Sequence, residues 1–328
     1  MTAFICPACR SPVERRGDAH TCASCDRDYP VLFGIPDFRL RGDQYLSLDE
    51  ERAKAARLHD YAENHDLEAV VAFYYSITDD VPAHLAPLFA DYVLKAPERS
   101  KPALNHLAPE GGRSLLDLGC GSGGALVAAK SSFAKRTGVD VALRWLVIAQ
   151  KRLNELGMQA DLVCADAEAL PFADGQFSHV LAGDLLENTR SPSATLGQAG
   201  RILEAGGRLL ASSTNRRWIG PHPATGVWAA GLLPAGLRSA VLKRRHGVDI
   251  LRAISFVTPR SVRQMAEAAG LQQLDVRPLE VGRAEGRSTL TRSLASVYST
   301  LAKMPGFRTI LVVAGPLFQS LFVKEKTS

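Results

Sequence analysis

Three glycines in a predicted turn and an acidic residue further along the chain are candidates for binding a ligand. The segment 114–124 is a short apolar run followed by a turn that contains Gly119, Gly121 and Gly123. Glycine lacks a Cβ, so such a turn can take positive φ and bring the backbone close to a ligand. Asp140 lies 17 residues beyond Gly123, about the interval at which dinucleotide folds place a carboxylate on ribose hydroxyls. No Gly-Lys-Ser/Thr follows, which disfavours a P-loop, and the glycines do not follow the dinucleotide pattern G-x-G-x-x-G.

Four cysteines near residue 1 form a second group that could do chemistry. They follow the pattern C-x2-C-x12-C-x2-C, as Cys6, Cys9, Cys22 and Cys25. This spacing is close to that of zinc sites in which four thiolates bind one Zn²⁺ tetrahedrally and close its coordination shell. Two disulfides and a redox pair are the alternatives, and a cytoplasmic chain disfavours disulfides. The spacing therefore predicts a structural zinc site in a small ribbon at residues 1–40.

The order of apolar runs and turns predicts an α/β fold that positions the glycines and acids. Short continuous apolar runs are typical of buried parallel strands. A Gly-Gly turn precedes the fifth run, and Thr258 and Gly270 have the residue types that begin and end a helix. The expected strands lie at 115–118, 137–140, 162–167, 177–182, 208–210, 271–279 and 317–324.

This ordered series of motifs resembles the class I S-adenosylmethionine-dependent methyltransferases over about residues 110–215. The resemblance implies a seven-stranded Rossmann-like sheet with helical insertions, beside the small N-terminal zinc ribbon. It also implies that S-adenosylmethionine is the cofactor.

The resemblance further assigns cofactor contacts to residues at the strand ends. Asp117 and the three glycines are expected to line the methionine end of the cofactor. Asp140 is expected to accept hydrogen bonds from both ribose hydroxyls, which is a charge-assisted pairing. Asp166 is expected to contact the adenine amine, with the backbone N–H of Ala167 on a ring nitrogen. Trp145 either packs against the adenine or packs its helix against the sheet.

The acceptor side is expected beyond the carboxyl end of the fourth strand, where open α/β sheets bind ligands. Asp184 and Glu187 lie there, and either one is a candidate for orienting the acceptor, with a role at a helix N-terminus as the alternative. Many relatives have Glu-His where this chain has Glu187-Asn188, and asparagine is no base at neutral pH. His222, which follows the fifth strand, is therefore the candidate general base. A structural or surface histidine is the alternative.

The motifs divide the chain into three expected parts. Residues 1–40 form the zinc ribbon as a separate module, and residues 41–110 form a helical approach or lid segment. Residues 111–328 form the methyltransferase domain, with insertions at about 216–257 and 282–316 where relatives build acceptor pockets.

Composition and charge limit the partners. Of the 328 residues, 46% are hydrophobic and 22% charged, which suits a soluble globular protein. Residues 201–328 carry 19 Lys/Arg against 7 Asp/Glu, a balance of +12, although the whole chain has a net charge of +5. A basic third of this kind suits an RNA, an anionic substrate, an anionic membrane surface or simply a solvated face. No transmembrane segment or secretory leader is recognised, so we expect a cytoplasmic protein, with peripheral membrane contact as an alternative.

These observations predict an enzyme that transfers a methyl group to O, N or C of a small, hydrophobic acceptor molecule. Two alternatives stay open. One is a ribosomal-RNA base methyltransferase of the zinc-ribbon type, which the basic third favours. The other is a non-catalytic adaptor that keeps only the fold.

Overall fold

A seven-stranded mixed sheet forms the centre of the protein in the computed structural model, which describes residues 3–78, 81–223, 225–249, 251–279, 298, 300, 302 and 304–326. Its strand order is β10-β11-β9-β8-β5-β6-β7. The strands from β9 to β7 are parallel, and β11 runs antiparallel to both β9 and β10. Their bounds are β5 Gly112–Leu118, β6 Phe133–Asp140, β7 Asp161–Cys164, β8 Phe177–Ala182, β9 Leu203–Thr214, β10 Leu271–Pro278 and β11 Leu317–Lys324. The predicted α/β class and seven-stranded sheet are confirmed.

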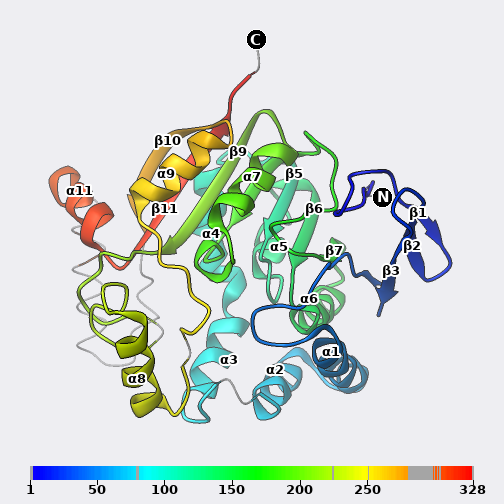
Figure 1. The fold of residues 1–328 in the computed structure, drawn as a ribbon, viewed down its shortest axis with the longest axis horizontal. Helices are drawn as coiled ribbons and strands as arrows, with labels where there is room; N and C mark the ends of the chain where they lie inside the picture. Colours follow the sequence, from blue (N-terminus) through cyan, green and yellow to red (C-terminus); the bar gives the residue numbers. More distant parts are fainter. Residues whose placement is uncertain are drawn as a thin grey trace.

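The side chains of β5 alternate between the two faces of the sheet, and each face is covered by its own helices. Leu116 and Leu118 pack in one core cluster and Leu115 in another, because successive side chains of a strand point to opposite faces. Helices α7 and α9 supply the first cluster, whereas α4 and α5 supply the second. Figure 1 shows these helices on the two sides of the sheet.

The helices have the following bounds: α1 Leu48–Ala62, α2 Leu67–Ser76, α3 Ala86–Leu94, α4 Ala96–Leu107, α5 Gly124–Ala128, α6 Leu143–Glu155, α7 Pro192–Ile202, α8 Ala235–His246, α9 Pro259–Ala268 and α11 Pro305–Ala314. The segment expected to be a helical approach contains α1 to α4. Ser47 and Glu50 form a capping box that begins α1, and such a box satisfies two backbone N–H groups that would otherwise lack partners. Helices α1 and α2 pack against α6.

The N-terminal ribbon contains four short strands, β1 Glu14–Arg16, β2 Ala19–Cys22, β3 Arg27–Leu32 and β4 Ile35–Pro36. Its apolar side does not form a separate core. Cys6, Tyr29 and Phe38 belong to the same buried cluster as Phe172 of the methyltransferase part. The backbone N–H of Ile5 also donates to the carbonyl of Pro171, at 3.0 Å. The sequence suggested a separate module, because spacing alone does not reveal which face of a ribbon is apolar.

The insertion at 216–257 forms its own small core around Val227, Leu242 and Leu251 and contains α8. Most of the second insertion lies outside the described residues, and its described part includes α11. No helix in the described part of the chain has the length and apolar character needed to span a bilayer. The domain boundaries stay predictions.

We predict that the change Phe38→Ala lowers the free energy of unfolding by about 3–5 kcal/mol, the usual cost of removing a buried phenylalanine ring. Phe38 is fully buried and its ring lies 5.0 Å from the rings of both Phe4 and Tyr29. Because this core is shared, ribbon and sheet are expected to unfold in one transition in urea. Two separate transitions, with the second at the wild-type midpoint, would contradict the shared core.

Candidate functional site

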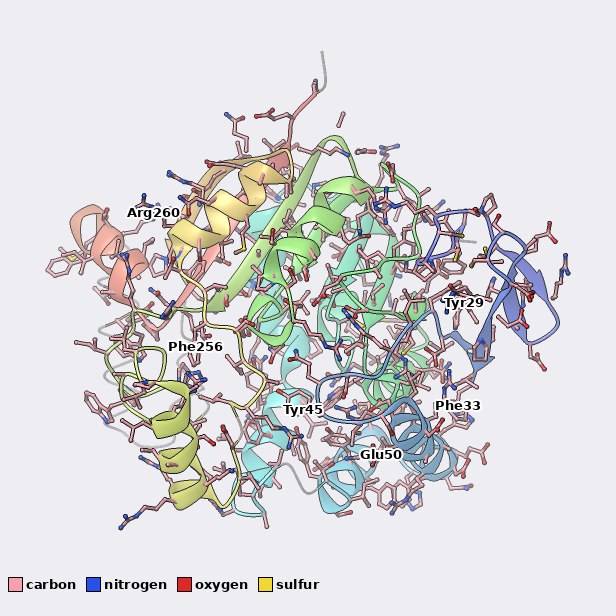
Figure 2. The ribbon with its side chains drawn as sticks, viewed as in Figure 1. Tyr29, Phe33, Tyr45, Glu50, Phe256 and Arg260 are labelled. Atoms are coloured by element: carbon pink, nitrogen blue, oxygen red, sulfur yellow. The ribbon has the colours of Figure 1, made fainter. Side chains whose placement is uncertain are left out.

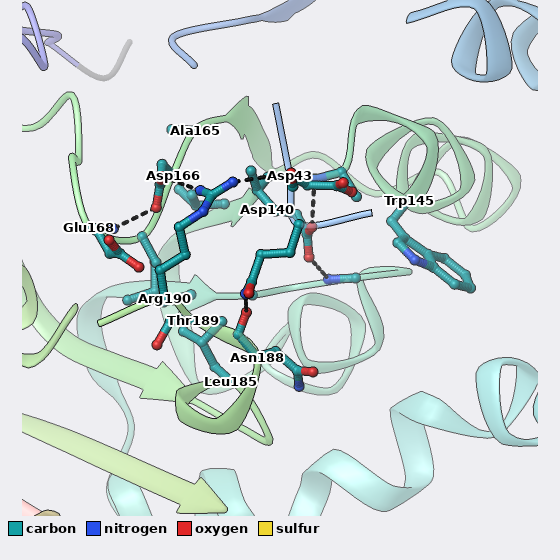
Figure 3. Close-up of a pocket in the computed structure, with 18 of the residues that line it drawn as sticks. Asp43, Asp140, Trp145, Ala165, Asp166, Glu168, Leu185, Asn188, Thr189 and Arg190 are labelled. Carbon is teal, nitrogen blue, oxygen red and sulfur yellow. Dashed lines mark hydrogen bonds and ion pairs between the residues drawn. The ribbon is translucent and has the colours of Figure 1, made fainter. Parts of the chain in front are cut away.

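A cavity of about 270 Å³ opens at the carboxyl ends of β5, β6 and β7. Ligands of open α/β sheets bind at this edge, near the point where the strand order reverses. Leu118 and Val139 form an apolar part of its lining, and Asp140 and Asp166 contribute carboxylates from neighbouring strands. The combination of an apolar surface with two carboxylates suits a molecule that has both an aromatic ring and hydroxyl groups. Figure 3 shows this edge of the sheet.

The glycine-rich turn takes the backbone shape predicted for it. Gly119, Gly121 and Gly123 have φ of 77°, 48° and 75°, a region that disfavours residues with a Cβ. Gly119 and Gly121 line the cavity. A Cβ on Gly119 would come within 2.8 Å of Leu185 Cδ1, so that position is closed to larger residues. Gly123 does not line the cavity: it precedes α5, and a Cβ there would lie 3.1 Å from Ala149 Cβ.

Asp140 holds two backbone segments beside the cavity. One carboxylate oxygen accepts a hydrogen bond from the N–H of Gly121 and the other from that of Ala142, both at 2.9 Å. Burial raises the pKa of Asp140, and these two N–H groups partly oppose that rise. Each carboxylate oxygen has two acceptor sites, so both keep capacity for a further donor on the cavity side.

Asp117 is buried below the glycine-rich turn and is not part of the cavity lining. Burial raises its pKa to about 7, and the nearby charge of Asp140 adds to the rise. Its expected contact with the methionine end of a cofactor therefore lacks support from this geometry.

Asp166, Ala167 and Trp145 line the cavity, and their contacts with the adenine stay predictions. Asp166 pairs with Arg41, whose Nη2 lies 3.0 Å from Oδ2, and more distantly with Arg190, at 3.6 Å. The Trp145 ring also packs against the buried Tyr74, with ring centroids 4.5 Å apart. Both expectations for this tryptophan, cavity lining and packing, are therefore compatible with its position.

Asp184 is the acidic residue of the predicted acceptor side that lines the cavity. It has φ of 50°, a conformation in which aspartate is enriched among residues other than glycine. The hydroxyl of Ser212 donates to Asp184 Oδ1 at 3.1 Å and accepts from its backbone N–H at 3.0 Å. The hydroxyl of Tyr92, from α3, donates to Oδ2 at 3.4 Å. These contacts fix the carboxylate at the end of β8.

Glu187 does not line the cavity and is 3% exposed. It accepts hydrogen bonds from the Ser213 hydroxyl at 2.7 Å and from the Thr214 N–H at 3.1 Å. It thus joins the short 3₁₀ helix Leu186–Asn188 to β9. Burial raises its pKa to about 7, and the charge of Asp184 adds to the rise.

His222 also lies outside the cavity and is buried within the 216–257 insertion, beside its small core. Its ring makes an edge contact with Phe256 at 6.2 Å, a residue beside α8 in Figure 2. Burial, with a smaller contribution from the nearby Arg238, lowers the pKa of His222 to about 4. The sequence analysis placed His222 after the correct strand, but the insertion folds so that this side chain is buried within the insertion and does not reach the cavity. We therefore no longer assign it the role of the base.

The sequence reasoning missed the residues that cover the cavity. Asp43, Gln44 and Tyr45 lie in its lining although they are far from the strands in sequence. Asn188 and Arg190, which also line it, bond to this covering segment. The excess of charged residues around position 43 was the available signal, and it does not distinguish a covering segment from a solvated loop.

The four N-terminal cysteines converge as predicted. Their sulfur atoms all lie within 4.8 Å of one another, and none of them forms a disulfide. The Cys6–Cys25 and Cys9–Cys22 sulfur distances are 3.6 and 3.5 Å, well above the roughly 2.05 Å of a disulfide. Such a cluster of four thiols has the ligand set of a metal site.

Comparisons with known proteins show which proteins this chain is similar to. Residues 116–211 match the family model described as a methyltransferase domain. The chain is 30% identical over 179 residues to the ubiquinone biosynthesis O-methyltransferase of Idiomarina loihiensis, covering 53% of this chain and 68% of that protein. It is 24% identical to the enzyme of the same name from Coxiella burnetii, covering 57% and 75%. A solved methyltransferase structure from Mesorhizobium loti is 18% identical, with a TM-score of 0.48 over 69% of this chain and 97% of that one.

We predict that Glu187→Gln weakens the pH dependence of stability. A folded-state pKa of about 7, above the unfolded value, stabilises the fold at low pH and loses that contribution as pH rises through 7. The wild type is expected to lose about 2–3 kcal/mol more between pH 5 and pH 8 than the variant. Glutamine can keep both contacts, because the Ser213 hydroxyl can accept instead of donate. Urea titrations at pH 5 and pH 8 measure the free energy of unfolding. If wild type and variant lose the same amount of it between the two pH values, this assignment is contradicted.

Proposed function

The chain belongs to the class I S-adenosylmethionine-dependent methyltransferases, and we propose that it methylates a hydroxyl group of a small hydrophobic acceptor. The match to a methyltransferase domain and the O-methyltransferase relatives support methyl transfer to a small acceptor. The observation that carries the choice of a hydroxyl is Asp184, a fixed carboxylate in the cavity lining. The relatives named as O-methyltransferases of ubiquinone biosynthesis support an oxygen acceptor.

The cavity fits the cofactor in its chemistry. We propose that Asp140 accepts hydrogen bonds from the ribose hydroxyls, since both of its oxygens have remaining acceptor capacity. Gly119 and Gly121 leave room for close approach, and a Cβ on Gly121 would meet no atom within 4 Å. Asp166 and Ala167 are proposed to hold the adenine, and Trp145 to flank it. For Asp166 this role requires its carboxylate to share the Arg41 contact with the adenine amine.

The proposed acceptor chemistry needs few protein groups. The bound cofactor supplies an electrophilic methyl group, so the protein has to align a nucleophile and exclude water. With the cofactor bound, Asp184 would accept a hydrogen bond from the acceptor hydroxyl and take its proton, while the S–CH₃ bond of the cofactor would break as the O–CH₃ bond forms and S-adenosylhomocysteine would leave. Ser212 and Tyr92 would hold the carboxylate in place while this happens.

Exposed apolar side chains support a hydrophobic acceptor. In the 216–257 insertion Ile219 and Trp228 are 66% and 68% exposed. We propose that this insertion contributes to the acceptor pocket. An RNA acceptor remains the second candidate because α8 ends in four basic residues, Lys243, Arg244, Arg245 and His246. RNA binding would weaken steeply with salt, whereas binding of a neutral hydrophobic molecule would not.

We predict that Asp140→Ala weakens S-adenosylmethionine binding by about 1.5–3 kcal/mol, the usual value of hydrogen bonds to a charged group. Isothermal titration calorimetry measures this directly. Asp60→Ala, an exposed change on α1, is the control and should leave affinity unchanged. An unaltered affinity in Asp140→Ala would remove the ribose assignment.

We predict that Asp184→Asn lowers turnover about 10²–10⁴-fold, the usual contribution of acid–base catalysis, with little change in cofactor affinity. Asparagine tolerates the left-handed backbone at this position, so the local fold is kept. Asp26→Asn is a matched control, because Asp26 is exposed and also has positive φ, at 51°. Turnover is followed with labelled cofactor and host small-molecule extracts, and wild-type turnover in Asp184→Asn would show that the acceptor needs no base here.

We further propose that Cys6, Cys9, Cys22 and Cys25 bind one structural Zn²⁺. Tetrahedral coordination at about 2.3 Å places sulfur atoms about 3.8 Å apart, which the present cluster approaches. Metal analysis of protein purified without chelator is expected to give one zinc per chain. A content near zero in folded protein would refute the assignment.

A further inference from the structure

The chain leaves the ribbon along the edge of the central sheet, where it makes an isolated β-bridge. Asp37 pairs in parallel with Cys164 of β7, and the Phe38 N–H donates to the Cys164 carbonyl at 2.7 Å. Asp166, two residues after Cys164, lines the cavity. The ribbon and the cavity are therefore joined through one edge of the sheet. In Figure 2 Tyr29, the hydroxyl of which contacts Cys6 at 3.1 Å, lies on the side of the ribbon that faces the sheet.

A buried ion pair fixes the direction of the chain at this edge. The side chains of Asp37 and Arg39 are 0% exposed and 2.8 Å apart, and Arg52 of α1 joins Asp37 at 2.9 Å. Arg39 also donates to the carbonyl of Val141, which lines the cavity, at 3.1 Å. We call these three residues, Asp37, Arg39 and Arg52, the Asp37 node. Buried charges are costly unless every partner is in place, so the node allows few alternative paths for the chain.

The next residues cross the cavity, and we call the segment 41–46 the strap. The side chain of Gln44 donates to the Asn188 carbonyl at 2.8 Å, and Arg190 donates to the carbonyls of Gly42 and Asp43. Arg144, at the beginning of α6, pairs with Asp43 at 3.1 Å. Figure 3 shows the side chain of Arg190 between Asp166 and the strap. The strap is thus held on the ribbon side by the Asp37 node and on the far side by residues that follow β8.

We propose that the strap is part of the cofactor-binding site and that the ribbon's metal and the cofactor bind cooperatively through it. The metal orders the ribbon, the ribbon positions Phe38 and the Asp37 node, and the node presents Asp43, Gln44 and Tyr45 to the cofactor. Coupling of this kind is reciprocal: each ligand raises the affinity of the other by the same factor. The inference rests on the cofactor site proposed above.

The direct test measures the coupling in both directions with S-adenosylhomocysteine as the probe. Calorimetry on the full chain with zinc and after chelation is expected to give a dissociation constant about 5–150-fold weaker without the metal, the usual range of allosteric coupling. In the zinc-loaded protein, saturating S-adenosylhomocysteine is expected to raise zinc affinity against a competing chelator by the same factor. If the chelated chain unfolds, any ligand of the folded protein raises zinc affinity in the second measurement, and the coupling is then judged by comparing wild type with the Arg52→Ala variant.

Arg52→Ala isolates the node, because Arg52 is 36% exposed and its loss leaves the Asp37–Arg39 pair intact. The variant is expected to keep its zinc but to lose most of the coupling. Arg57→Ala, an exposed change on the same helix, is the matched control and keeps it. Gln44→Ala is expected to weaken S-adenosylhomocysteine binding. Zinc affinity measured without S-adenosylhomocysteine is expected to stay the same in this variant.

Two results separate this inference from the proposed function. Zinc-loaded wild type that fails to bind S-adenosylhomocysteine overturns the cofactor site itself. The coupling alone is overturned if folded, chelated wild type binds S-adenosylhomocysteine as tightly as the zinc-loaded protein does. It is also overturned if S-adenosylhomocysteine binds but leaves zinc affinity unchanged. If Arg57→Ala loses as much coupling as Arg52→Ala does, the proposed role of the Asp37 node is also refuted.

Discussion

The carboxylate of Asp140 is the interaction on which the site depends. It accepts one hydrogen bond from the turn after β5 and one from the start of α6, so two loops from neighbouring parallel strands share one partly buried carboxylate. A carboxylate out of water is costly, and burial raises its pKa accordingly. The arrangement is stable because each oxygen accepts a backbone N–H, and it is useful because each oxygen keeps acceptor capacity for a ligand. Positive φ at the glycines lets the turn reach that carboxylate without steric strain.

Paired buried charges extend this order to segments that are distant in sequence. Arg144 contacts both Asp43 and Glu51, so the start of α6 is tied to the strap and to α1. Replacing such pairs by apolar residues often costs no stability. We therefore attribute to them a role in fixing the path of the chain over the cavity, rather than a large share of the folding energy.

The central sheet was predictable because its chemistry is local. Leu115, Leu116 and Leu118 give a buried strand its apolar run, and the glycines that follow mark its end. The strap was not predictable, because Asp43 acquires its role from Arg144, 101 residues away. Glu187 and His222 show the same limit: proximity in sequence to β8 and β9 does not tell which side of a turn faces the cavity. For His222 the decisive event is the pairing of Asn215 with Val257, which closes the insertion on itself.

The central claim is that the cofactor binds at the ends of β5, β6 and β7 beneath the strap. A crystal structure of the zinc-loaded chain with S-adenosylhomocysteine tests it most directly. The account predicts the ribose hydroxyls on Asp140, the adenine beside Asp166 and Trp145, and Gln44 and Tyr45 in contact with the ligand. Density for the ligand elsewhere, or in this cavity with the strap displaced and making no contact, would contradict it.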